Sequence, residues 1–130
     1  MEKKNKNEFS MPDIREWLTV LDSLRQENIA LKYRLSEAVR QSISRPFIET
    51  AEVFQQKSVD KDQLIDLLRH DIANLLIKMK FNDIVDNDAV VLQQQARTLE
   101  TDVQKVVSGF EQMKQAFDQY LTGYDAPGSK

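Results

Sequence analysis

Apolar residues recur along most of this chain in alternating steps of three and four, the spacing that places side chains on one face of an α-helix. The first segment with this spacing contains Ile14, Trp17, Leu21, Leu24, Leu31, Leu35 and Ala38. Turn-forming residues are scarce: the 130 residues include only 3 Gly and 3 Pro, and two of the glycines and one proline lie after Thr122. Because a protein with many strands needs more turns than this, we expect an all-α chain.

The first helix is expected to follow a polar tail over residues 1–9. Ser10 can cap the helix, Pro12 fits its first turn, and Asp13 stands three residues after the cap. The apolar residues form a heptad seam, with Ile14, Leu21, Asn28 and Leu35 at a positions and Trp17, Leu24, Leu31 and Ala38 at d positions. Pro46 interrupts the pattern, so the helix either kinks there or gives way to a new one. Because Phe47, Ala51 and Phe54 continue the apolar face, we expect one long kinked helix over residues 12–56.

A second helix is expected to begin at Asp60, which with Val59, Gln63 and Leu64 forms a capping box and a hydrophobic staple. Its core stripe is expected to be Ile65, Leu68, Ile72, Leu75 and Met79. Segment 81–88 is rich in turn formers and should connect it to a third helix that ends near Thr122. The third helix carries Leu92, Ala96, Leu99, Val103, Val106, Phe110, Met113, Phe117 and Tyr120 on one face. The result is a single helical domain over residues 10–122, with a second loose tail over 123–130.

The predicted helix lengths differ greatly, at roughly 65, 30 and 50 Å. The second helix can cover only the second half of the first, so the heptad seam needs another partner. A lone Asn28 at an a position is typical of parallel two-stranded coiled coils, in which the two amides hydrogen-bond across the axis. We therefore expect a homodimer held by Trp17, Leu21, Leu24, Asn28, Leu31 and Leu35. The alternative is that the seam packs on the third helix of the same chain, with Asn28 at the edge of the bundle.

The single histidine, His70, falls at the outermost position of the second helix, where a solvated histidine with no special role is the simplest interpretation. With Asp71 and Asn74 it forms the pattern H-D-x-x-N, which resembles the H-box of histidine-kinase dimerisation domains and histidine phosphotransferases. The resemblance implies that His70 accepts phosphate, that Asp71 orients or deprotonates its imidazole, and that Asn74 is a polar neighbour. Leu75 stands where the kinase motif usually has proline, and no ATP-binding domain is present.

Composition argues against several other functions. There is no cysteine, hence no thiolate nucleophile and no cysteine-ligated metal, and the aspartates of segment 81–88 lack the spacing of a calcium loop. The net charge of −3 and the lysines before Pro12 do not form a basic region for nucleic acid. No apolar run approaches the roughly 18 to 20 residues that span a bilayer. We expect a cytoplasmic protein without cofactor, metal or membrane insertion.

Three short stretches, Trp17-Leu18, Glu27 to Leu35 and Leu68 to Ile72, look like a group of small uncharacterised bacterial α-helical coiled-coil proteins. That resemblance implies a helical coiled-coil fold and no activity. The sequence thus predicts a non-enzymatic oligomerising scaffold or adaptor that acts on an unknown protein partner. The alternative is a histidine phosphotransfer protein centred on His70.

Overall fold

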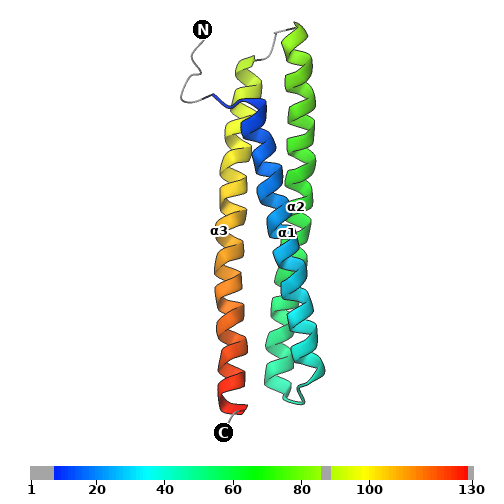
Figure 1. Cartoon of the computed structure of the whole chain (residues 1–130), viewed down its shortest axis with the longest axis vertical. Helices are drawn as coiled ribbons and strands as arrows, with labels where there is room; N and C mark the ends of the chain where they lie inside the picture. The colour runs from blue at the N-terminus through cyan, green and yellow to red at the C-terminus, as the bar shows by residue number, and fades with distance from the viewer. Residues whose placement is uncertain (1–7, 86–88, 129–130) are drawn as a thin grey trace.

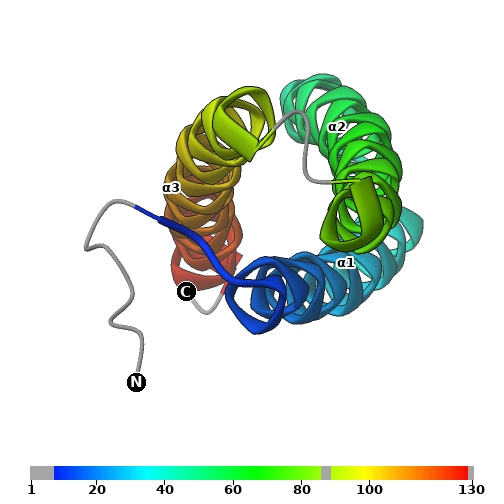
Figure 2. The ribbon, with the colours of Figure 1, turned by 90° about the horizontal axis from the view of Figure 1, so that it is seen from above.

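The structure, a computed structural model, is a bundle of three long helices that run antiparallel in succession (Figure 1). It describes residues 8–85 and 89–128, and the side chains of residues 8–81 and 89–123 among them. The helices are α1 (Met11–Arg40), α2 (Arg45–Val85) and α3 (Ala89–Gly128), and the described residues contain no strand. Viewed from the end, the three helices surround one common axis (Figure 2). The all-α prediction is confirmed.

The start of α1 follows from its capping residues, as the sequence predicts. The Ser10 hydroxyl accepts a hydrogen bond from the backbone N–H of Asp13 at 3.2 Å, and the Asp13 carboxylate accepts one from the Ser10 N–H at 2.8 Å. This reciprocal capping box satisfies two backbone donors that the first turn would otherwise leave unpaired. The helix ends at Arg40, where the N–H of Gln41 bonds to the carbonyl of Ala38.

The structure does not contain the long kinked first helix that we predicted over residues 12–56. The chain leaves the helical path after Arg40, and α2 begins at Arg45 with Pro46 in its first turn, where the missing N–H has no helical partner to lose. The Ser44 hydroxyl accepts a hydrogen bond from the N–H of Phe47 at 3.3 Å and so caps the new helix. Pro46 therefore separates two helices.

The predicted start of the second helix at Asp60 is also wrong, because α2 passes through that residue without interruption. No glycine or proline lies between Pro46 and Val85 to stop the helix. The inner face continues in one register across the predicted boundary through Phe47, Ala51, Phe54, Ser58, Ile65, Leu68, Ile72 and Leu75, all of which are buried. A capping motif begins a helix only where the preceding residues cannot continue one.

Two further predicted boundaries differ from the structure or lie outside it. The predicted connection 81–88 begins too early, because α2 extends to Val85, and residues 86–88 lie outside the described residues. Helix α3 does not end near Thr122 but continues through Gly123 to Gly128. A single glycine costs a helix about 1 kcal/mol relative to alanine, which is too little to end one of this length. Most of the predicted tail 1–9 also lies outside the described residues.

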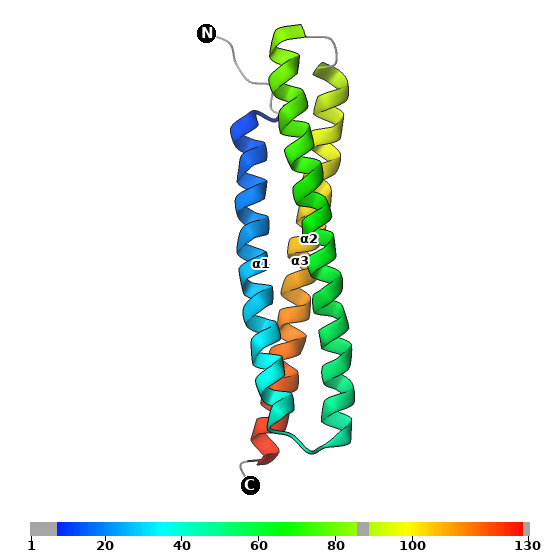
Figure 3. The same cartoon turned by 90° about the vertical axis from the view of Figure 1, so that its right-hand side faces the viewer.

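The corrected lengths explain how α1 is covered. Helix α2 has 41 residues and α3 has 40, against 30 for α1, so both neighbours run along the whole of α1 and extend past its N-terminal end (Figure 3). The heptad seam of α1 consequently faces inward: Ile14, Leu21, Leu24, Asn28, Leu31 and Leu35 are all buried within one chain. At the opposite end, the hydroxyl of Tyr120 donates to the carbonyl of Phe47, and the two rings stack at 4.7 Å.

Because the seam is internal, replacing Leu24 and Leu31 together by glutamate should unfold the chain. Truncating one buried leucine to alanine already costs about 2 to 5 kcal/mol, and a buried unpaired carboxylate costs more. We expect loss of helical circular dichroism in the double variant and retention in Ile29→Glu, because Ile29 on the same helix is 50% exposed. A helical, monomeric double variant derived from a dimeric wild type would instead place the seam between two chains.

Candidate functional site: the outer face of α2

The residues predicted to hold a dimer lie in the interior of the bundle. Leu21, Leu24, Leu31 and Leu35 are between 0% and 4% exposed and belong to the single core shared by the three helices. Trp17 is partly buried and packs edge-on against Phe9, with the ring centres 5.4 Å apart. The chain's own helices therefore cover the four leucines, and they cover Trp17 in part.

Asn28 contributes the buried polar contact between α1 and α2. Its Nδ2 donates to the backbone carbonyl of Ser58 at 2.9 Å and to the carboxylate of Asp62 at 2.8 Å. Lys32 binds the other carboxylate oxygen of Asp62. Asn28 Oδ1 and Ser58 Oγ are buried and have no hydrogen-bond partner among the described residues. The amide thus makes its hydrogen bonds within one chain, and its pairing across a dimer axis stays a prediction.

Asp62 is the ionisable group that this network perturbs. Partial burial raises its pKa, but hydrogen bonds from Lys32 and Asn28 and the charges of Lys32 and Arg25 outweigh that effect and hold the pKa below its usual value of 3.8. Two exposed ion pairs, Arg25 with Asp66 and Arg69 with Asp22, continue the contact toward the N-terminal end of α1. Such exposed pairs contribute little stability one by one, but they agree with the register that Asn28 imposes.

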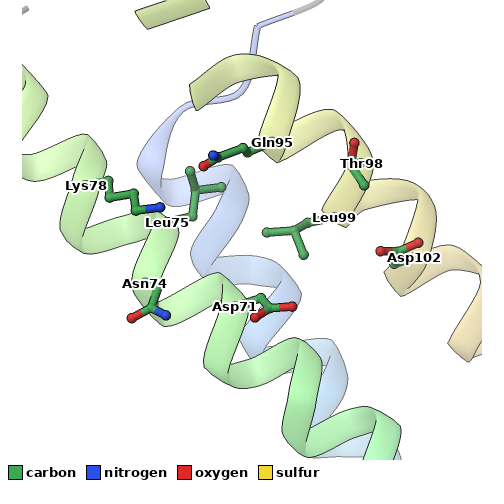
Figure 4. Close-up of a pocket in the computed structure, with 8 residues that line it drawn as sticks. All are labelled: Asp71, Asn74, Leu75, Lys78, Gln95, Thr98, Leu99 and Asp102. Atoms are coloured by element: carbon green, nitrogen blue, oxygen red, sulfur yellow. The ribbon is translucent and has the colours of Figure 1, made fainter. Parts of the chain in front are cut away.

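His70 lies exposed on the outer face of α2, as the sequence predicts. Its Nε2 is 3.3 Å from Nδ2 of Asn74, one turn further along. Asp71 is adjacent in sequence, but successive residues point about 100° apart on a helix, and its side chain lies in the groove between α2 and α3 (Figure 4). No hydrogen bond joins Asp71 to His70 in the part of the chain that the structure describes. The structure therefore brings His70 and Asn74 together and turns Asp71 away from His70, although Asn74 and Asp71 line the same groove.

Two shallow hollows lie along the groove between α2 and α3. The one in Figure 4, of about 330 Å³, we call the acidic hollow; it is lined by Asp71, Asn74, Leu75, Lys78, Gln95, Thr98, Leu99 and Asp102. The other, of about 400 Å³, we call the basic hollow; it is lined by Lys57, Asp60, Lys61, Leu64, Gly109, Gln112, Met113 and Ala116. In the basic hollow the side chain of Lys61 reaches across to α3, and a Cβ on Gly109 would stand 2.7 Å from its Nζ.

A stripe of exposed apolar side chains runs along the outer face of α2. Five of the ten exposed large apolar residues in the described chain belong to it: Val53, Leu64, Leu67, Ile77 and Phe81. Val53, Leu67 and Phe81 share one heptad register with the polar residues Asp60 and Asn74. We call these seven residues the outer stripe. The outer stripe was not predicted, because the predicted helix boundary at Asp60 divides it between two helices. Its seven-residue spacing is the sequence signal that could have revealed it.

Comparisons with protein-family models, with curated proteins and with solved structures found no match to this chain. Its functional interpretation therefore rests on its own geometry. Within residues 8–85 and 89–128 no three histidine, aspartate or glutamate side chains are grouped to hold a metal ion. Over the same ranges no helix has both the length and the apolar character needed to cross a membrane. The outer face of α2, with His70 and the outer stripe, is the candidate functional site.

The lowered pKa of Asp62 predicts how stability depends on pH. Because its pKa is lower in the folded chain than in the unfolded one, the stabilisation is complete above pH 3.8 and is lost as the pH falls further through the folded pKa. We expect Asp62→Asn to lower the free energy of unfolding at pH 7, and the difference from wild type to shrink as the pH falls below about 4. Urea denaturation at pH 7 and at pH 3 measures both values. A difference that stays constant or grows on acidification would contradict this role for Asp62.

Proposed function

We propose that this chain is a non-catalytic helical module that acts through protein–protein contacts, with the outer face of α2 as its docking surface. The observation that carries the proposal is the outer stripe itself. The inner face of α2 already supplies the core, so folding does not require apolar side chains on its outer face. Exposed apolar side chains that recur along one helix face often mark an interaction site.

The outer stripe differs from the other exposed apolar residues in its extent. Ile29 and Tyr33 form one short patch on α1, and Val90 and Val91 are neighbours at the start of α3. Such isolated exposure is normal on protein surfaces. The outer stripe runs over residues 53–81, about 42 Å of helix, which is long enough to receive a partner helix along its length.

This proposal keeps the predicted function, a non-enzymatic adaptor or scaffold. It assigns the partner contact to the outer face of α2 instead of the α1 seam. The α1 seam forms part of the core of the bundle, and docking on α2 leaves every core contact in place. The expected cytoplasmic location is compatible with such a module and belongs to the same proposal.

Site-specific photocrosslinking tests the proposal. A benzophenone amino acid at Leu67, which is 55% exposed, should give a discrete crosslinked protein product in cells that make this chain. The same probe at Ile29, which is 50% exposed on α1, is the matched control and should crosslink several-fold less. Equal, diffuse labelling from the two positions would overturn the assignment of the docking surface.

A second candidate function is phosphoryl acceptance by His70. The observation that favours it is the exposed imidazole, which a partner enzyme can reach and which Asn74 contacts at 3.3 Å. Because Asp71 lies in the groove, we assign it no role in activating the imidazole, in contrast to what the H-box resemblance implies.

Incubation with phosphoramidate tests this second function. It should produce acid-labile, base-stable phosphate that is absent in His70→Gln. Labelling should fall in Asn74→Ala and remain at the wild-type level in Asp71→Ala, because only Asn74 contacts the imidazole. No label on the wild type, under conditions that phosphorylate a known histidine acceptor, would remove this function.

A further inference from the structure

We infer that the outer stripe docks on a second copy of this chain, with the two α2 helices antiparallel and Leu67 of each copy at the two-fold axis. The inference rests on the proposed function and names its partner. It differs from the predicted homodimer in surface and in direction, because that dimer was parallel and used α1.

The positions of Val53, Leu67 and Phe81 support a two-fold axis at Leu67. Val53 lies fourteen residues before Leu67 and Phe81 lies fourteen after it. In an antiparallel pair centred on Leu67, the two leucines therefore meet each other and each Val53 meets the Phe81 of the other copy. The polar members match as well, since Asp60 and Asn74 lie seven residues on either side and face each other as acceptor and donor.

The charges along the α2–α3 groove point to the same arrangement. On α2, Leu67 lies midway between the basic hollow, which spans residues 57–64, and the acidic hollow, which spans residues 71–78. An antiparallel copy places each basic hollow beside the other copy's acidic hollow. Lys61 of one copy and Asp71 of the other then differ by two residues in height, about 3 Å along the axis. Opposite charges at nearly the same height along the contact steer and orient association.

The positive residue of the acidic hollow also finds a partner in this arrangement. Lys78 of one copy comes level with Gln56 of the other, one residue from Lys57, and Asp60 lies one turn beyond that Lys57, about 6 Å along the axis from Lys78. The order along the axis is two lysines followed by one aspartate, and Asp60, one turn from Lys57, offsets part of the repulsion between the two lysines.

A parallel pair in the same register is far less favourable. It would set Asp60 against Asp60, and it would place the α2–α3 grooves of the two copies on opposite sides of the contact, so that no basic hollow lies beside an acidic hollow. Like charges held directly opposite each other destabilise an interface, and nothing on the outer stripe compensates for them. The distribution of charge therefore selects the antiparallel direction.

The size of the outer stripe determines how tightly we expect two copies to associate. The outer stripe is far smaller than the roughly 20 to 30 residues that each side of a standard stable interface supplies, so the dimer should be weak and concentration-dependent. Sedimentation equilibrium from about 5 to about 500 µM covers the micromolar affinities expected of such an interface. Leu67→Glu should lower the association constant at least about tenfold, because two carboxylates then meet at the axis.

Ile29→Glu is the matched control, since it removes a similarly exposed apolar residue and adds the same charge elsewhere. It should associate like the wild type. Circular dichroism should show that both variants keep their helices, because both positions are exposed. A wild type that remains monomeric at the highest concentration, or a dimer that Leu67→Glu leaves intact, would overturn the inference.

Disulfide formation between introduced cysteines tests the direction of docking. The chain has no cysteine of its own, so every disulfide that forms joins introduced positions. Asp60→Cys and Asn74→Cys, one of them carrying a tag of different mass, are mixed and mildly oxidised. Antiparallel docking predicts the mixed disulfide. Equivalent positions lie fourteen residues apart in this arrangement, about 21 Å, which is beyond the roughly 7 Å that a disulfide spans between Cα atoms. Predominant disulfides between identical variants would overturn the antiparallel register.

These results separate the inference from the proposed function. A monomeric wild type whose Leu67 probe still crosslinks to a different protein would remove self-association and retain the docking surface. A dimer that depends on Leu67 and forms the mixed disulfide supports both.

Discussion

The amide of Asn28 fixes how α1 lies against α2, and the rest of the bundle depends on that register. It donates to the backbone of Ser58 and to the carboxylate of Asp62 from a fully buried position. Sliding α1 by one turn, about 5.4 Å, would leave these groups unpaired in the core, at about 1 to 3 kcal/mol for each. The leucines of α1 tolerate such a shift far better, because apolar contacts are not directional. A single polar side chain therefore specifies an alignment that the apolar seam leaves open.

The sequence identifies the residues of this seam but not the partner that covers them. A heptad pattern states which face of a helix is buried, and an intramolecular bundle satisfies it as well as a second chain does. The decision between the two depends on the length of α2. Val59, Asp60, Gln63 and Leu64 form a plausible helix start, and accepting it shortened α2 so much that the seam lacked a neighbour. The start of α1 at Ser10 was predictable because its cap is followed by an uninterrupted apolar stripe, whereas α2 already had such a stripe before Asp60.

The candidate site was predictable only for side chains whose exposure depends on the face of α2 that they occupy. The exposure of His70 and its proximity to Asn74 follow from helical spacing alone. Whether Asp71 lies in a groove depends on where α3 packs, and the spacing of residues within α2 carries no information about the position of α3. The outer stripe was not predictable for a related reason. Helix α2 carries apolar residues on two faces, and the helical spacing of the sequence alone does not separate one wide apolar face from two narrow ones. The structure shows that the core buries Ile65, Leu68, Ile72 and Leu75. The apolar residues that remain exposed on α2 are those of the outer stripe.

Two kinds of dimer can be compared by what each requires of the folded chain. Pairing through the α1 seam requires α1 to leave the bundle, which exposes Leu21, Leu31 and the other buried leucines and breaks the hydrogen bonds of Asn28. That cost approaches the free energy of unfolding of a domain this small, about 5 to 15 kcal/mol. Docking on α2 requires only that exposed apolar and polar side chains lose water, and it leaves the Asn28 contacts and the core unchanged. Association on the outer stripe can therefore be weak and reversible without affecting the stability of the fold.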